Sequence, residues 1–164
     1  MQIRPMKLED IEQVVAMENK TWDNFNTPAS LPAANKHKII QAFQNHSHYL
    51  VAEENGVILG VLDYHAYYPF PSARHVVSFI IAVDKDTQGQ GIGHSLIQAF
   101  FTVAKSDNYK KVVIHVLSSN KNACRFYENI GFTLEATLKN QFYLNGTYVD
   151  DLIYSYYLEE IHAK

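Results

Sequence analysis

The chain has 164 residues and a mass of 18.8 kDa, the size of one ordinary domain. Hydrophobic residues make up 47% and charged residues 19%, so we expect a packed core rather than a disordered tail. A net charge of -3 is not the basic excess of a protein that neutralises phosphates, so nucleic acid is not expected as its main partner. A single cysteine, Cys124, excludes an internal disulfide framework and a cysteine-based zinc site.

The sequence also favours a protein of the cytoplasm without a membrane partner. No apolar run approaches the roughly 20 residues that a membrane span needs, and the first ten residues contain no apolar core of a secretion signal. We find no repeat, low-complexity tract or linker rich in proline, glycine or serine. One domain over residues 1–164 is therefore the simpler interpretation.

The first third of the chain predicts a strand, two helices and a strand pair. Apolar residues recur at helical spacing from Leu8 to Val15, and Asn55-Gly56 stands between two apolar runs, which is a strong hairpin signal. The expected elements are a strand at 2–5, a helix from about residue 8, a loop over 21–34, a helix over about 35–45, and strands at 49–52 and 57–62.

The rest of the chain predicts a parallel unit followed by a second hairpin. The expected elements are a strand at 75–83, a helix ending near 105, a strand at 111–117, a helix over about 120–129, and extended segments at 132–144 and 147–158 joined by Asn145-Gly146. The strand at 75–83 is almost wholly apolar, as in a strand covered on both faces. A strand, helix and strand of this length imply parallel pairing, so the pattern is that of a mixed sheet in the α/β or α+β class.

The chemistry begins at residues 88–93, where three glycines alternate between a buried strand and a helix. Glycine lets the backbone approach a ligand, and the helix start offers unpaired N–H groups, which together suit a pyrophosphate. A phosphate loop of the nucleotide-hydrolase type would need Gly-Lys-Ser/Thr, whereas Gly93 is followed by His94 and Ser95. The glycine spacing also fails the dinucleotide pattern. The plainer alternative is a strand-to-helix turn.

A second cluster covers residues 120–132. If this segment is helical, Asn120, Ala123, Tyr127 and Ile130 share one stripe, and Gly131 is a natural helix end. A polar side chain at the helix start and a phenol two turns later would therefore face the same way.

These two clusters resemble the motifs of the GNAT superfamily of N-acetyltransferases. The acyl-CoA loop of that family, Q/R-x-x-G-x-G/A, is matched by Gln88, Gly91 and Gly93. The later family motif is matched by Asn120, Ala123, Phe126, Tyr127, Glu128, Gly131 and Phe132. The resemblance implies a mixed, mostly antiparallel sheet, flanked by helices, in which a central parallel strand pair splays apart. The order of elements agrees over nearly the whole chain.

The resemblance also implies acetyl-CoA as co-substrate. Its pantetheine arm would enter between the splayed strands, and backbone N–H groups from Gly89 through His94 would hold its pyrophosphate. The implied cofactor-binding residues are Ile81, Val83, Gln88, Gly89, Gln90, Gly91, Ile92, Gly93, His94 and Asn120. For Asn120 the alternative is an ordinary helix N-cap.

Tyr127 is the candidate catalytic residue, a general acid that would give its proton to the thiolate leaving group. The alternative is a core tyrosine. Many family members place a glutamate on the strand before the loop as general base, but residues 75–82 contain no carboxylate. His75, Ser78 through water, His65, Asp150 and a water chain remain open for that role. For Cys124 a small buried residue is favoured over a nucleophile.

The function implied is transfer of an acetyl group to a primary amine of a small molecule, such as an amino acid, a polyamine or a related amine, by direct attack in a ternary complex. A non-catalytic acyl-CoA-binding or sensing module and a protein N-terminal acetyltransferase are the alternatives. Eight histidines without an H-E-x-x-H motif do not predict a metal site. Residues that could line the acceptor side are Trp22, Phe25, Tyr64, Tyr67, Tyr68, Tyr143, Asp63, Asp150 and Asp151. Homodimers are common in the superfamily, and the sequence leaves the oligomeric state open, as it does the use of other acyl groups.

Overall fold

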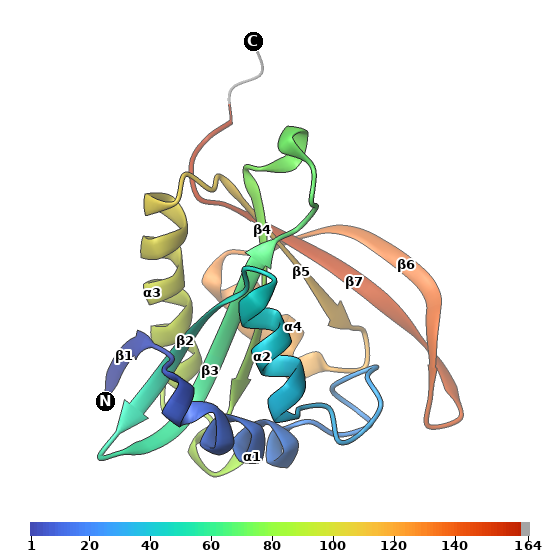
Figure 1. Cartoon of the computed structure of the whole chain (residues 1–164). Coiled ribbons are helices and arrows are strands. Elements are labelled where there is room, and N and C mark those ends of the chain that lie inside the picture. The colour runs from blue at the N-terminus through green and yellow to red at the C-terminus, as the bar shows by residue number, and fades with distance from the viewer. Residues whose placement is uncertain (162–164) are drawn as a thin grey trace.

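Seven strands form one mixed sheet in the order β1-β2-β3-β4-β5-β7-β6. The computed structural model describes residues 1–161 (Figure 1). The strands are β1 (Gln2–Pro5), β2 (His48–Glu54), β3 (Val57–Ala66), β4 (Val76–Val83), β5 (Lys111–Leu117), β6 (Thr133–Leu144) and β7 (Thr147–Tyr157). Only β4 and β5 pair in parallel, and every other neighbouring pair is antiparallel. The predicted mostly antiparallel sheet with a central parallel pair is confirmed.

Helices cover both faces of this sheet. They are α1 (Ile11–Thr21), α2 (Lys36–Gln44), α3 (Ile92–Ser106) and α4 (Lys121–Ile130), with short 3-10 turns at Leu8–Asp10, Pro71–Ala73 and Lys85–Thr87. Because side chains alternate along a strand, Val51 and Val61 pack with α1 and α2, whereas Leu50 and Leu62 pack with α3. In the described residues no helix is long and apolar enough to cross a membrane.

The expected helix start at residue 8 is displaced by one turn. Residues 8–10 form a 3-10 turn and Leu8 is 75% exposed, so the apolar face of α1 begins at Ile11 instead. The Asp10 carboxylate explains the tight turn, because it accepts hydrogen bonds from the Lys7 backbone N–H at 2.7 Å and from the Arg4 guanidinium at 2.7 and 2.9 Å.

Both Asn-Gly pairs form the hairpin turns that the sequence predicts. Asn55-Gly56 joins β2 to β3 and Asn145-Gly146 joins β6 to β7, and all four residues have positive φ angles between 51° and 79°. Such angles are those of the turn type whose twist matches a hairpin. The first pair of strands is longer than predicted, since β3 continues to Ala66 opposite Val77 of β4.

The two parallel strands separate soon after they meet. The β4–β5 ladder consists of Val76 opposite Lys111 and Val77 opposite Val112 only. Beyond it, β4 stays paired with β3 as far as Val83, and β5 stays paired with β7 as far as Leu117. The facing edges of β4 and β5 therefore carry backbone N–H and C=O groups that do not hydrogen-bond to each other. An extended ligand could form hydrogen bonds with these groups. The helices α3 and α4 both begin at this open end (Figure 1).

Candidate active site

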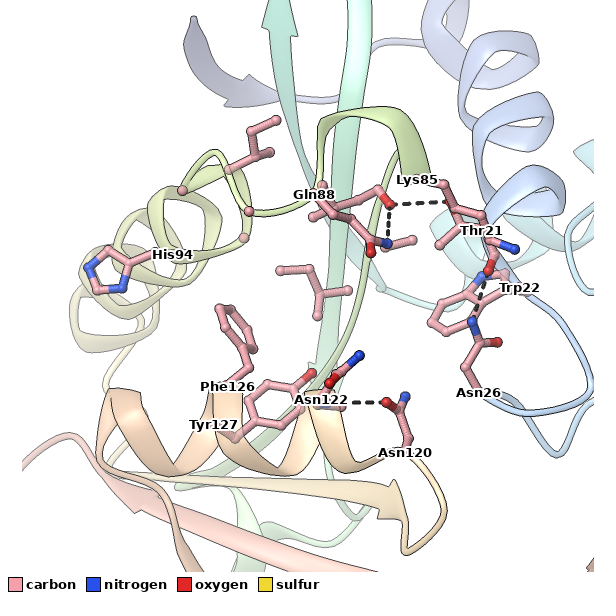
Figure 2. Close-up of a pocket in the computed structure, with 18 of the residues that line it drawn as sticks. Thr21, Trp22, Asn26, Lys85, Gln88, His94, Asn120, Asn122, Phe126 and Tyr127 are labelled. Atoms are coloured by element: carbon pink, nitrogen blue, oxygen red, sulfur yellow. Dashed lines mark hydrogen bonds between the residues drawn. The ribbon is translucent and has the colours of Figure 1, made fainter.

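A cavity of about 770 Å³ lies where the two strands separate (Figure 2). Its walls are the end of β4, the glycine loop with the start of α3, the start of α4, and the segment that follows α1. The lining residues are Thr21, Trp22, Asp23, Asn26, Ile81, Ala82, Val83, Lys85, Gln88, Gly89, Gly91, Ile92, Gly93, His94, Asn120, Asn122, Ala123, Phe126 and Tyr127. Tyr127 and all the implied cofactor-binding residues line this cavity except Gln90, which is exposed.

The glycine loop presents backbone N–H groups at the start of α3. Gly91 is the N-cap of α3 with φ of +81°, a left-handed conformation that glycine adopts at little cost. A Cβ atom built on Gly91 would meet no atom within 4 Å, so the space beside the loop is open. The first intrahelical bond runs from Ser95 N–H to Gly91 O, which leaves the N–H groups of Ile92, Gly93 and His94 without a helical acceptor. This arrangement suits an anion.

Gly93 has a different reason to be glycine. A Cβ atom there would lie 3.1 Å from Cζ of Phe126 and 3.7 Å from Cγ2 of Val83. The first turn of α3 and the second turn of α4 therefore approach closely beside the end of β4. This contact fixes the position of the glycine loop relative to Tyr127, the next residue on α4.

The carbonyl of Val83 already accepts two side-chain hydrogen bonds. Gln88 Nε2 and Thr21 Oγ1 each donate to it at 3.3 Å, as the dashed lines in Figure 2 show. Gln88, the first residue of the family-like loop motif, thus ties the loop back to the end of β4. A ligand amide at Val83 would share or replace these two long bonds.

Tyr127 lies on α4 with only 9% of its surface exposed. Its ring packs against Phe79, Phe126 and Phe132, and Figure 2 shows the hydroxyl pointing into the cavity. Burial raises the pKa of this phenol above its ordinary value, and the nearby Cys124 adds to the rise. The side chain is therefore both a core residue and a protonated hydroxyl at the cavity wall, so the two interpretations of Tyr127 are compatible.

Asn120 forms the N-cap of α4 and also stands in the cavity wall. Its Oδ1 accepts a hydrogen bond from the Ala123 backbone N–H at 3.2 Å, which is the N-cap contact of α4. The residue also lines the cavity, so its amide nitrogen is placed to donate to a ligand. At the other end of α4, Gly131 has φ of +111° and ends the helix as predicted.

A second cavity of about 380 Å³ adjoins the first between the separated ends of β4 and β5. Its lining residues are Trp22, Asn26, Pro28, Phe79, Ile80, Ile81, Ile114, His115, Val116, Leu117, Asn120, Ala123, Tyr127, Phe142 and Asp151. Trp22, Asn120 and Tyr127 line both cavities, so the two spaces meet beside the Tyr127 phenol. The expectation that β4 is covered on both faces is wrong at Ile80, which is 51% exposed because it faces this space.

The second cavity contains a histidine that the sequence does not single out. His115 Nδ1 lies 2.7 Å from Asp151 Oδ2, and His115 Nε2 lies 2.8 Å from the Tyr67 hydroxyl. Asp151 is 5% exposed. The available signal is that His115 is the only polar residue inside the apolar run 112–117, but its partner comes from β7, and strand pairing cannot be read from local sequence.

None of the four side chains considered as general base lines either cavity. Ser78 is buried, and His65 Nδ1 lies 3.7 Å from Asp63 Oδ1. The carboxylate of Asp150 accepts a hydrogen bond from the Asn140 backbone N–H at 2.8 Å within the final hairpin. The structure therefore does not bring these groups to the cavity beside Tyr127.

Only some of the predicted acceptor-side aromatic residues lie near the cavities. Trp22 lines both cavities and Tyr67 bonds to His115. Tyr64 is buried against Phe100 in the core beside α3, and Tyr143 is 65% exposed. Cys124 is buried and lines neither cavity. Within residues 1–161, no three histidine, cysteine or acidic side chains gather as ligands for a metal ion.

Comparison with known proteins gives a matching family and several similar structures. The acetyltransferase (GNAT) family model matches residues 11–132. The crystal structure of smu.2055 from Streptococcus mutans is 57% identical, with a TM-score of 0.94 over 97% of this chain and 100% of that one. The structure of yncA from Salmonella typhimurium with acetyl-CoA is 22% identical, with a TM-score of 0.87 over 100% and 97% of the two chains, a likeness of fold.

Among characterised relatives, the L-amino acid N-acyltransferase MnaT of Escherichia coli is 29% identical over 89 residues. That match spans 54% of this chain and only 52% of the relative. The matched family model covers most of the chain and includes both motifs and the cavity between them. This chain belongs to the GNAT acetyltransferase family.

Proposed function

We propose that the chain is an acetyl-CoA-dependent N-acetyltransferase that acts on a primary amine of a small molecule. The observation that carries this proposal is the separation of β4 from β5 after two residue pairs, with the glycine loop at one end of the gap and Tyr127 beside it. A binding module needs the gap and the loop, but it does not need a protonated phenol at the junction of two cavities.

The residues present fit acetyl-CoA. The edge of β4 offers backbone groups to the amides of a pantetheine arm, and the start of α3 offers N–H groups to a pyrophosphate. The cavity between them is largely apolar, with Ile81, Val83, Ala123 and Phe126 in its walls. The co-substrate would supply the acetyl group as a thioester, and the residues of the cavity would hold that thioester in place.

The chain's own groups favour direct attack by the amine. The only thiol, Cys124, lines neither cavity, so no cysteine is placed to carry the acetyl group. Two joined cavities can instead hold both substrates together, and positioning them accounts for much of the rate. Tyr127, kept protonated by burial, would give its proton to the sulfur as the C–S bond breaks.

The second cavity suits an amine better than an anion. Its titratable lining residues are Asp151, His115 and Tyr127, and no lysine or arginine stands among the residues that line it. An amino acid, a polyamine or a related amine fits the proposal, and the E. coli relative is an L-amino acid N-acyltransferase. A polyamine has no carboxylate to place, so the lining favours it over an amino acid.

The test is thiol release from acetyl-CoA with a panel of free L-amino acids, spermidine and a short peptide with a free N-terminus. We expect release above hydrolysis with a small amine and an N-acetyl product of matching amount in the mass spectrum. Release with the peptide alone would favour a protein N-terminal acetyltransferase. A thermal shift with acetyl-CoA but no release with any amine would favour the sensing module.

A further inference from the structure

We propose that His115 is the general base of this reaction and that Asp151 is its positioning residue. The inference rests on the proposed function, because His115 would accept the proton that the substrate amine loses in the proposed acetylation. It answers the absence of a carboxylate on β4, the strand on which many family members carry one.

The strand register brings the two side chains together. His115 of β5 is opposite Ile153 of β7, and Leu117 is opposite Asp151, so His115 and Asp151 point to the same face one step apart. Asp151 Oδ2 lies 2.7 Å from His115 Nδ1. A carboxylate only accepts hydrogen bonds, so this contact places the proton of a neutral imidazole on Nδ1 and leaves the lone pair on Nε2.

The imidazole of His115 is accessible from the second cavity, and the Tyr67 hydroxyl, from a residue outside the lining of both cavities, occupies its Nε2. The His115 side chain is 40% exposed and lines the second cavity, whereas Asp151 behind it is buried. The Tyr67 hydroxyl lies 2.8 Å from Nε2 and donates to it. Tyr67 belongs to the connection between β3 and β4 and is only partly buried, so an incoming ammonium can take its place as donor.

The acid and the base then stand on two sides of one junction. Tyr127 lines both cavities, and His115 lines only the one that we assign to the amine. His115 Nε2 takes a proton from the ammonium, and the freed nitrogen lone pair forms the C–N bond. As the C–S bond breaks, Tyr127 protonates the sulfur, and the second proton lost from nitrogen restores the phenol. His115 returns its proton to water, so the net products are the amide, the free thiol and one proton.

Charged and titratable groups face His115 from each neighbouring element. They are Asp151 of β7 and Tyr67 after β3, which contact the imidazole, and Tyr127 of α4, which lines the same cavity; the ion pairs Lys111–Glu135 and His65–Asp63 lie further along β5 and on β3. Within residues 1–161, only Asp151 and Tyr67 form side-chain hydrogen bonds with the imidazole.

The test is a pH profile of kcat/KM for His115→Asn with the amine that gives the fastest thiol release. Asparagine can still donate to Asp151 but cannot accept the proton. We expect a loss of about 100-fold in kcat/KM, mainly in kcat, and disappearance of the acidic limb that His115 gives the wild-type profile. Asp151→Asn should lower kcat by at least about 10-fold, because the tautomer is no longer fixed. His75→Asn is the matched control, since His75 lines neither cavity.

Acetyl-CoA binding, followed by thermal shift, should be unchanged in all three variants, which shows that they fold. Unchanged kcat with an unchanged acidic limb in His115→Asn would overturn the assignment. So would a loss confined to KM, since His115 would then only bind the amine. Wild-type protein that releases no thiol with any amine would contradict the proposed function itself, so the two failures are distinguishable.

Discussion

Tyr127 is a buried phenol whose hydroxyl points into the cavity (Figure 2). Its ring completes an aromatic cluster with Phe79 and Phe132, and burial keeps the hydroxyl protonated because a phenolate would lose its solvation. The same burial therefore serves packing and keeps the phenol in the protonated form that the proposed acid role needs. The residue could be singled out from the sequence because the helix register places it on the stripe of Asn120.

Tyr127→Phe should lower kcat by about 100-fold and leave acetyl-CoA affinity nearly unchanged. Phenylalanine keeps the ring packing and removes only the proton donor. Steady-state thiol release and calorimetric titration with acetyl-CoA measure the two quantities. Tyr64→Phe is the control, because Tyr64 is also buried but lines neither cavity. Equal turnover in wild type and Tyr127→Phe would exclude the acid role.

The raised pKa of Glu18 on α1 makes the stability of the fold depend on pH. Burial, with a smaller contribution from Asp63, raises the pKa of Glu18 from 4.5 to about 7. The folded state thus holds a proton that the unfolded chain releases, so stability is full below pH 4.5 and falls as pH rises to about 7. The loss is of the order of 3 kcal/mol for a shift of this size.

Glu18→Gln should remove this loss, so that the variant gains stability relative to wild type as the pH rises from 5 to 8. Urea unfolding at each pH, followed by the fluorescence of the single tryptophan, Trp22, gives the free energy of unfolding. A constant difference between the two proteins over this range would show that Glu18 does not titrate near 7.

At the scale of elements, the glycine loop and the start of α3 form the unit to which we assign anion binding. The motif at residues 88–93 could be predicted from sequence because glycine is required locally, at Gly91 by its left-handed backbone. The role of Gly93 could not, because its reason is the approach of Phe126 from another helix. Gln90 shows the converse, since it belongs to the motif segment but does not line the cavity.

Gly91→Ala and Gly56→Ala form a matched pair that separates backbone strain from ligand binding. Both glycines have φ near +80° and open space around a built Cβ, but Gly56 lies in the β2–β3 turn. Each substitution should cost about 1 kcal/mol of stability. Only Gly91→Ala should weaken acetyl-CoA binding, by about 10-fold, because it alone disturbs the N–H groups at α3. Equal acetyl-CoA affinity in both variants would argue against the loop as the anion site.

At the scale of the whole molecule, the function depends on how strands from distant parts of the chain are ordered. The apolar runs predict the strands and helices well, and the family resemblance implies the splayed pair. The pairing of β5 with β7 is different, because it joins Leu117 to Asp151 across the sheet and so creates the His115 contact. The periodicity of apolar residues and the turn residues can be read from local sequence, but this strand register cannot. The sequence alone therefore does not distinguish His115 as a site residue.

Backbone hydrogen–deuterium exchange with and without acetyl-CoA tests most directly whether the gap between β4 and β5 is the binding slot. We predict slower exchange at residues 80–83 of β4 and at 89–94 of the glycine loop when acetyl-CoA is bound, with little change in the β2–β3 turn around Gly56. Saturating acetyl-CoA that leaves exchange in both segments unchanged, or that protects only the outer strands β1 and β6, would contradict this placement.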